Sequence, residues 1–192
     1  MNSACGRFGY HGVTLLCLDA VSLCADSDAE APAAEVAWSA KAARLLAHAR
    51  GHGWSVGHVI PRRPRTGEAR WRPLAGLAPE PSEPVYHREQ PSAFSSPDLC
   101  AALEGGRRLE VVLCGVSVRG SGLATALDAL RLAVRLTIVT DAAWLPQAER
   151  DGLDGVLQLQ RSGLTHDVVR LAPIGDLLRA GPPLRVLQGG RR

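Results

Sequence analysis

The sequence predicts an α/β protein, a three-layer α/β/α sandwich built around a mostly parallel sheet of about six strands. Two observations lead to this prediction. Short apolar runs alternate along the chain with longer amphipathic segments, as in a parallel sheet that is covered by helices on both faces. The chain has 192 residues, 46% hydrophobic and 21% charged, which is enough apolar material for the core of one domain.

The elements follow in order from the hydrophobic periodicity. Strands are expected at residues 13–18, 55–60, 84–87, 109–114, 134–139 and 164–168, where the apolar runs are short. Helices are expected between them and after the last one, at residues 33–50, 96–104, 121–132, 146–160 and 174–179.

The remaining segments define the domain boundaries. Residues 61–83 are rich in Pro, Gly and Arg, which in a compact domain favours a functional loop or lid. No internal repeat and no linker divides the chain. We expect a flexible N-terminal tail over residues 1–12, a single domain over residues 13–180 and a C-terminal tail over residues 181–192.

Charge and hydropathy exclude several classes of protein. The net charge of +3 and pI near 8.8 lack the concentrated basic patch of a nucleic-acid-binding protein. No apolar run approaches the roughly 20 residues that span a bilayer, and no secretory signal opens the chain. The five cysteines show no CxxC spacing, and Cys17 and Cys114 lie in apolar runs typical of buried core residues. We therefore expect a cytoplasmic protein without a membrane or nucleic-acid partner.

Candidate functional residues lie directly after the predicted strands. Asp19 follows the first strand, Arg88 follows the third, and the turn GVSVRGS, which ends at Ser121, follows the fourth. In an open parallel sheet, ligands bind outside the carboxyl ends of the strands. These three residues are therefore predicted to face one site.

From residue 13 to about residue 178, the sequence resembles the isochorismatase-like (cysteine) hydrolases, a family that includes nicotinamidases, N-carbamoylsarcosine amidases and isochorismatases. The resemblance is carried by the segments LLCLDA, VYHREQPSAF, VVLCGVSVRGSGLATALDA and LTIVTDAA. Members typically use an Asp, a Lys and a Cys: the Asp takes the thiol proton, the thiolate attacks the substrate, and the Lys stabilises charge. The resemblance implies that Asp19 stands at the Asp position, Arg88 at the Lys position and Ser121 at the Cys position.

Two of these three positions are altered, which changes the chemistry that we expect. A thiol has a pKa of about 8.5 and is easily deprotonated, whereas an alcohol is a far weaker acid that normally needs a histidine-type base. Arg88 stays protonated and should clamp Asp19 in a bidentate pair that keeps the carboxylate ionised and less basic. Lys41 is the only lysine, and it lies on a predicted helix away from the strand ends. Ser121 could also be simply a helix N-cap or first-turn serine, and the N-cap role is favoured over nucleophilic attack.

The resemblance further implies an oxyanion hole formed by the backbone amides of Ser117 and Ser121, next to a cis peptide bond at Val116–Ser117. The other candidates for substrate contact are Arg63, Trp71, Phe94 and Arg119. Trp71 offers a flat surface and the arginines could bind an anionic group, although arginine-rich loops are usually solvated.

No metal and no cofactor are expected. The metal-binding relatives carry further histidines after the second strand, whereas His58 is followed by VIPRRPRTGE. His48 and His52 are spaced i, i+4 on a predicted helix and could chelate, but they flank Gly51 at the helix end and are more typical of solvated histidines.

Three functions remain open. The first is a divergent hydrolase or lyase that acts on a small carboxylated, amide or vinyl-ether substrate at the Asp19/Arg88/Ser121 site. Isochorismatases themselves have a small residue at the Cys position and use the first-strand Asp as a general acid, a role that needs a raised pKa. The second is a catalytically inactive relative that binds a small molecule. The third is an interaction subunit, since a homodimer or higher homo-oligomer is expected. Retention of Asp19, of the Ser-Ala-Phe segment and of the glycine turn favours the first two functions over the third, and the loss of the Cys and Lys argues against standard amidase chemistry. Of the first two, the enzyme is preferred.

Overall fold

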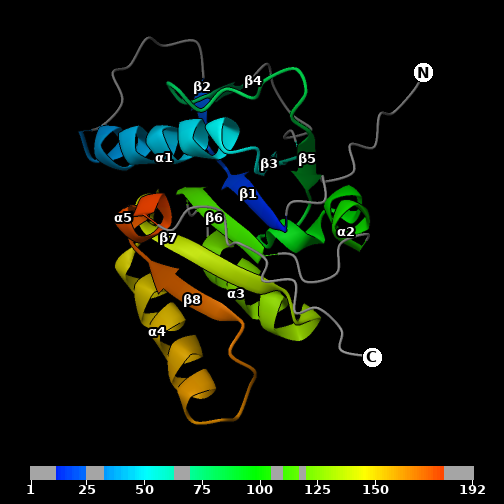
Figure 1. Ribbon diagram of the computed structural model, residues 1–192, viewed down its shortest axis with the longest axis vertical. Helices are drawn as coiled ribbons and strands as arrows, with labels where there is room; N and C mark the ends of the chain where they lie inside the picture. The colour runs from blue at the N-terminus through cyan, green and yellow to red at the C-terminus, as the bar shows by residue number, and fades with distance from the viewer. Residues whose placement is uncertain (1–11, 25–32, 63–69, 105–109, 117–119, 180–192) are drawn as a thin grey trace, which may run out of the picture.

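The computed structural model describes residues 12–24, 33–62, 70–104, 110–116 and 120–179. Its main sheet contains six strands in the order β5-β3-β1-β6-β7-β8, and every neighbouring pair is parallel (Figure 1). The strands are β1 (Val13–Leu18), β3 (Ser55–Pro61), β5 (Val85–Arg88), β6 (Glu110–Val116), β7 (Arg135–Trp144) and β8 (Val169–Ala172). The predicted α/β class is confirmed, with an entirely parallel main sheet.

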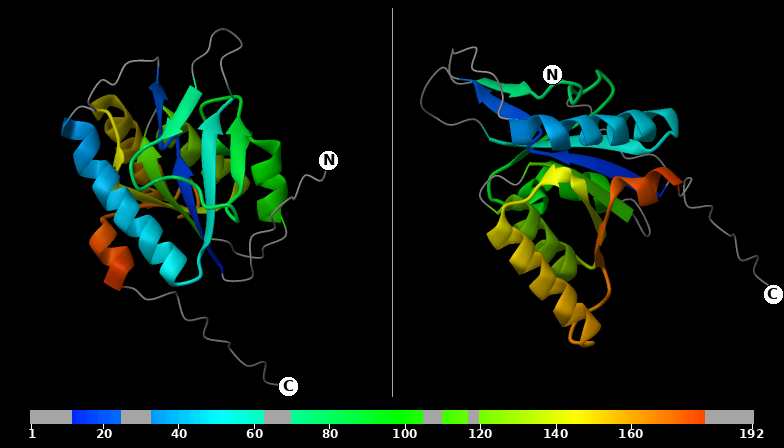
Figure 2. Two further views of the ribbon diagram at one scale, coloured as in Figure 1. Left: turned by 90° about the horizontal axis from the view of Figure 1, so that it is seen from above. Right: turned by 90° about the vertical axis from the view of Figure 1, so that its left-hand side faces the viewer.

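Helices cover both faces of this sheet (Figure 2). The long helix α1 (Ala33–Gly51) and the short α5 (Ile174–Arg179) pack on one face. The other face carries α2 (Pro97–Glu104), α3 (Ser121–Leu132) and α4 (Gln147–Arg161), together with the 3-10 turn η1 (Ala93–Ser95). These helices were predicted to within one residue of their observed ends.

The central strand β1 shows why the sheet forms. All six of its residues are buried. Leu15 and Cys17 belong to the core on the α1 side, whereas Leu16 and Leu18 belong to the core on the α3 side. Side chains alternate between the two faces of a strand, and a central parallel strand is covered on both. A continuous apolar run is therefore what this position requires.

The last strand lies further along the chain than predicted. The prediction of a strand at residues 164–168 is wrong, because β8 begins at Val169. The side chain of Gln160, at the end of α4, accepts hydrogen bonds from the amides of Val168 (2.9 Å) and Val169 (2.8 Å) and donates to the Val169 carbonyl (2.8 Å). The preceding residues thus form the turn between α4 and β8, and of these the Val168 carbonyl accepts a hydrogen bond from the Leu136 amide of β7 (2.8 Å).

The segment 61–83 is also more ordered than predicted. It contains β4 (Arg70–Pro73), which pairs with β2 (Val21–Cys24) in a separate two-stranded antiparallel sheet. The Leu74 amide continues this pairing with a hydrogen bond to the Ala20 carbonyl (3.1 Å). Because β2 begins two residues after Asp19, this small sheet lies beside the end of β1. The expected tails, 1–12 and 181–192, lie outside the described residues apart from Gly12.

A buried ionic network attaches the residues after β4 to the main sheet. Glu83 accepts two hydrogen bonds of 2.8 Å from Arg50, one of 2.9 Å from the Glu80 amide, and lies 2.9 Å from Nε2 of His58. Burial alone would raise the pKa of Glu83, but these partners lower it to about 2. Burial also lowers the pKa of His58.

Among the described helices, none combines the length and hydrophobicity that a membrane span requires.

Candidate active site

Asp19 occupies the point where β1 leaves the sheet. Its side chain is fully buried, and its backbone has a φ of 49°, in the left-handed region that residues other than glycine rarely adopt. The Asp19 amide donates to the Val59 carbonyl (2.8 Å), and the Asp19 carbonyl accepts from the Val21 amide (2.7 Å). Backbone strain of this kind persists where the surroundings enforce it, and it is concentrated at functional sites.

Arg88, at the end of β5, holds the Asp19 carboxylate in a bidentate pair. Nε lies 3.0 Å from Oδ1 and Nη2 lies 2.6 Å from Oδ2, while Nη1 donates to the Gln90 carbonyl at 2.7 Å. Only 7% of Arg88 is exposed. β1 and β5 are separated by β3 in the sheet, so the pair reaches across the carboxyl end of that strand.

Ser121 completes the cluster from α3. It is buried, and its hydroxyl hydrogen-bonds to the Asp19 carboxyl group. Ser121 is the first residue of α3, whereas the N-cap is Gly120, which has a φ of 79° and no side chain to cap the helix. Of the two structural roles expected for Ser121, the N-cap is therefore wrong, and the first-turn serine agrees with its position. The structure brings all three residues of the sequence-predicted triad together at the carboxyl edge of the sheet.

The electrostatics of Asp19 differ from the sequence-based expectation. Burial raises the pKa of Asp19 above its ordinary value, and this effect outweighs the bonds from Arg88 and Ser121, both of which lower it. Arg88 thus acts in the expected direction, but the prediction that the carboxylate would be less basic overall is wrong. A raised pKa makes Asp19 a stronger proton acceptor, and it brings the protonated acid closer to neutral pH.

Gly115 is the penultimate residue of β6, and it pairs with Leu18 in the register of β1 and β6. Its φ of 123° is accessible to glycine and strained for other residues. The register between β6 and β7 shifts at the same place, between Leu113 and Gly115. Gly115 therefore marks an irregularity in β6 beside the end of β1, after which β6 still pairs with β7 through Val116.

A residue that the sequence analysis missed fixes the start of α3. Glu149, in the first turn of α4, accepts hydrogen bonds from the amides of Gly122 and Leu123, the latter at 2.6 Å. These amides belong to the group that a helix N-terminus leaves without intrahelical partners, and the helix dipole favours a negative charge there. Burial raises the pKa of Glu149. Nothing in the sequence pattern indicates that the first turns of α3 and α4 meet.

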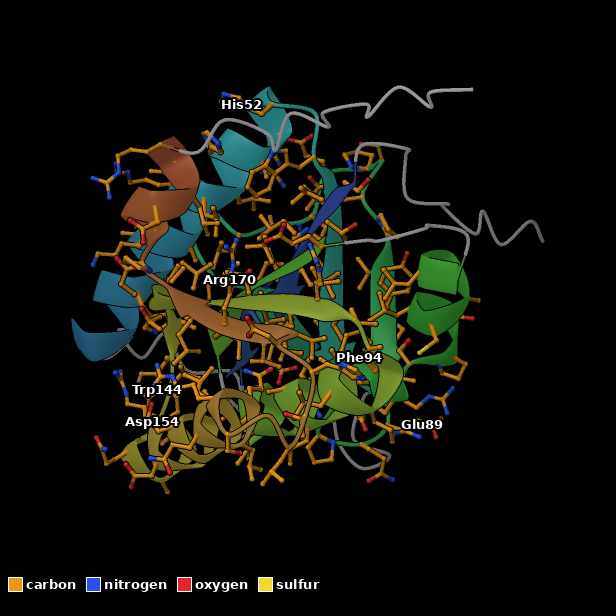
Figure 3. All side chains as sticks on the ribbon, turned by 60° about the horizontal axis from the view of Figure 1, so that its bottom comes forward. His52, Glu89, Phe94, Trp144, Asp154 and Arg170 are labelled. Carbon is orange, nitrogen blue, oxygen red and sulfur yellow. The ribbon has the colours of Figure 1, made fainter. Side chains whose placement is uncertain are left out.

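The Ser-Ala-Phe segment is joined to the same helix by Thr125. Its hydroxyl donates to the Ser121 carbonyl (2.6 Å) and accepts from the Ala93 amide (2.9 Å), and all three residues are buried. Ser92 caps η1 by accepting a hydrogen bond from the Phe94 amide (3.2 Å). Phe94 is itself only 6% exposed and packs in the core on the α3 side (Figure 3), so in this structure it supports the site through packing.

The other candidate substrate contacts lie outside the described residues. This holds for Arg63, Ser117 and Arg119, and therefore for the expected oxyanion hole and the Val116–Ser117 bond. Trp71 lies in β4, where the backbone is described but the side chain is not.

Two further groups of residues lie outside the cluster. Lys41 forms an ion pair of 3.1 Å with Asp141, whose other oxygen accepts from the amide of Ile174, the first residue of α5. His48 and His52 stack with their ring centroids 3.9 Å apart. In the part of the chain that the structure describes, no group of three or more His, Cys, Asp or Glu side chains is arranged to hold a metal.

Cys17 and Cys114 are buried as predicted, and their sulfur atoms lie 3.7 Å apart on neighbouring strands. The hydrogen bond between the two thiols and burial raise the pKa of Cys17 well above its ordinary value. The Cys17 sulfur therefore lacks the character of an activated thiolate.

Comparisons with known proteins agree with this architecture. The Isochorismatase domain family matches residues 13–153. Similar solved structures include an isochorismatase-like hydrolase from Alkaliphilus metalliredigens (18% identity, TM-score 0.65, 88% of this chain and 98% of that one) and an isochorismatase from Pseudomonas putida (23%, 0.62, 88% and 92%). A third is a cysteine hydrolase from Pseudomonas syringae (15% identity, TM-score 0.65, 90% and 93%). No curated protein matches the sequence. Because the matched domain covers most of the chain, this protein belongs to the isochorismatase-like hydrolase family.

Proposed function

We propose that this chain is a divergent hydrolase in which Asp19, Arg88 and Ser121 take the places of the family's Asp, Lys and Cys, and that it acts on a small carboxylated, amide or vinyl-ether substrate. One observation carries the proposal. The Arg88 guanidinium and the Ser121 hydroxyl both bond to the same buried carboxyl group at the carboxyl edge of the sheet. A buried carboxyl group with a perturbed pKa at this edge is typical of a catalytic site.

Proton donation by Asp19 is the chemistry that the site supports best. Burial raises the pKa of Asp19, as a general acid requires. Arg88 is always protonated, so it can orient the carboxyl group and stabilise negative charge but cannot exchange a proton. The Ser121 hydroxyl is held in place and can hydrogen-bond to a substrate oxygen. A vinyl ether, whose cleavage starts with protonation, is therefore the favoured substrate.

Attack by Ser121 is the less favoured route. Asp19 would have to take the proton of an alcohol whose pKa lies far above that of any carboxyl group, whereas a serine nucleophile is normally activated by a histidine-type base. The position of Ser121 at the N-terminus of α3 favours an alkoxide only modestly.

The test is a hydrolysis screen over amides, esters and vinyl ethers with the wild type, Asp19→Asn and Ser121→Ala. Loss of activity in Asp19→Asn alone is expected for the acid route, with a fall of roughly a hundredfold or more. Equal losses in both variants would favour serine attack. A fully active Asp19→Asn variant would contradict the proposal. Unfolding curves for both variants confirm that each remains folded, so that the loss of activity is chemical.

A second function, a catalytically inactive binding protein, is favoured by one specific observation. Arg88 directs Nε and Nη2 to Asp19 and Nη1 to the Gln90 carbonyl, which is the arrangement of a structural ion pair. Native mass spectrometry of the purified protein separates the two candidates. A retained small molecule together with no turnover in the screen supports the binding protein, whereas turnover supports the hydrolase.

A further inference from the structure

Glu149 belongs to one helix but binds the N-terminus of another. The helices α3 and α4 pack side by side on the same face of the sheet (Figure 2). Glu149 lies in the first turn of α4, where its amide donates to the Pro146 carbonyl (3.0 Å). An acidic side chain at this point ordinarily faces the N-terminus of its own helix. The Glu149 carboxylate instead reaches the backbone of α3, and the residue is only 5% exposed.

The amides that Glu149 binds are those that a bound anion would use. The first hydrogen bond within α3 runs from the Ala124 amide to the Gly120 carbonyl (2.9 Å). The amides of Gly122 and Leu123 precede it and have no acceptor inside the helix, and both donate to Glu149. Such amides and the helix dipole together form the anion-binding position of a helix N-terminus. In this chain a carboxylate of the protein itself occupies that position.

Gly122 leaves the space that the carboxylate fills. A Cβ atom at this position would lie 2.7 Å from Oε1 of Glu149 and 3.2 Å from Cδ2 of Leu145. Glycine is unfavourable within a helix, so its presence at Gly122 needs a reason in the surroundings. The close approach of the Glu149 carboxylate to the backbone of α3 supplies that reason. The contact is therefore fitted on both sides, by the length of the glutamate and by the missing side chain of the glycine.

Ser121 directly precedes these two amides, so it lies where a helix N-terminus acts on a nucleophile. The positive end of a helix favours an alkoxide or a thiolate and lowers the pKa of a cysteine placed there. A carboxylate bound to the same helix end acts in the opposite direction, because like charges disfavour each other. Among the described residues, the other charged groups at this point are Asp19, which bonds to the Ser121 hydroxyl, and Arg88, which bonds to Asp19.

We propose that the Glu149 carboxylate is the resident anion of the α3 N-terminus, and that it keeps Ser121 a neutral hydroxyl that donates a hydrogen bond instead of attacking the substrate. Glu149 acts through α3 and is therefore a positioning residue. Its part in the reaction rests on the proposed function, in which Asp19 donates the proton and Ser121 stays uncharged. The electrostatic effect on Ser121 needs no substrate, so it can be measured independently of the hydrolysis screen.

The experiment places a titratable probe at the position of Ser121. In the Ser121→Cys variant, formation of the thiolate is followed by its ultraviolet absorbance as the pH rises. The titration of the wild type, which contains the five native cysteines, is subtracted. Adding Glu149→Gln should lower the pKa of the introduced thiol by about 1, because glutamine keeps the shape of the side chain but removes its charge. A Glu149 with a purely structural role would leave this pKa where it is.

Two further variants in the Ser121→Cys background complete the test. Gly122→Ala displaces the carboxylate without changing any charge, since the atom that its methyl group meets is the end of a flexible side chain. It should lower the thiol pKa by a smaller amount, and it decides the question if circular dichroism shows that Glu149→Gln does not fold. Asp151→Asn is the matched control. Asp151 is an exposed acid on α4 that accepts a hydrogen bond from Gln147 (2.8 Å), and its loss should leave the thiol pKa unchanged.

Two results would overturn the proposal. A thiol pKa that Glu149→Gln leaves unchanged or raises would show that the carboxylate does not act on the Ser121 position. An equal fall of the thiol pKa in Asp151→Asn would assign the effect to the overall charge of α4 and not to the contact with α3. The expected fall together with no turnover in the hydrolysis screen would support the electrostatic effect of Glu149 and count against the hydrolase, so the two proposals can fail separately.

Discussion

A Cβ atom at Gly115 would lie 1.9 Å from the carbonyl oxygen of Leu18, far inside any possible contact distance. Gly115→Ala must therefore push β6 away from the end of β1, and it also strains a φ of 123°. We expect a loss of roughly 3 kcal/mol or more in the free energy of unfolding, measured by urea denaturation. Gly51→Ala is the matched control. Gly51 has open space around its Cβ position, and this variant should lose nothing.

The pKa of Asp19 can be tested through stability without any substrate. Because the folded-state pKa is raised above 3.8, the carboxyl group contributes stability that is present below that pH and is lost as the pH rises through the folded pKa. The stability deficit of Asp19→Asn relative to the wild type should therefore shrink as the pH rises from 4 to 7. A deficit that grows over this range, measured by urea denaturation at each pH, would mean that Arg88 outweighs burial.

Glu83 should show the opposite pH dependence. Its folded-state pKa of about 2, below the ordinary 4.5, contributes stability that is present above pH 4.5 and is lost as the pH falls toward 2. Glu83→Gln should cost on the order of 3 kcal/mol at pH 7, since one pKa unit corresponds to about 1.4 kcal/mol, and less in acid. The exposed Glu80 is the control: Glu80→Gln, which removes a surface ion pair with Arg50, should cost less than about 1 kcal/mol.

Thr125 provides a test of the connection between α3 and the Ser-Ala-Phe segment. Thr125→Val keeps the shape of the side chain but removes the acceptor of the buried Ala93 amide, so we expect a loss of about 1–3 kcal/mol in thermal or urea unfolding. Thr125→Ser retains the hydroxyl and should recover the hydrogen bonds at the smaller cost of one methyl group. If valine and serine at this position were equally destabilising, the hydrogen bond would not be the source of the effect.

Much of the fold could be predicted because the relevant signals are local. The helices and the first five strands of the main sheet, β1, β3, β5, β6 and β7, follow from apolar runs and their periodicity. β8 was misplaced because Gln160, an ordinary polar residue in the sequence, takes up the amides of Val168 and Val169. The small sheet of β2 and β4 was missed because its two strands are far apart in the chain, and one of them lies in a segment rich in Pro, Gly and Arg.

The site shows the same division between local and long-range information. The positions of Asp19, Arg88 and Ser121 after their strands could be predicted, because the carboxyl ends of parallel strands meet at one edge. The net pKa shift of Asp19 could not be predicted, since it depends on how deeply the surrounding elements bury the carboxyl group. The role of Glu149 could not be predicted either, because its hydrogen bonds to α3 require the first turns of α3 and α4 to touch.

The ion pair between Lys41 and Asp141 has a practical consequence. Lys41 is the only lysine in the sequence, and its side chain is 47% exposed on α1. Reagents specific for amines therefore have a single side-chain target in this protein. A dye or surface tether at that amine lies on the face of the sheet opposite α3 and α4 (Figure 2). The protein can thus be labelled or immobilised at one defined side chain while the face that carries α3 and α4 stays accessible.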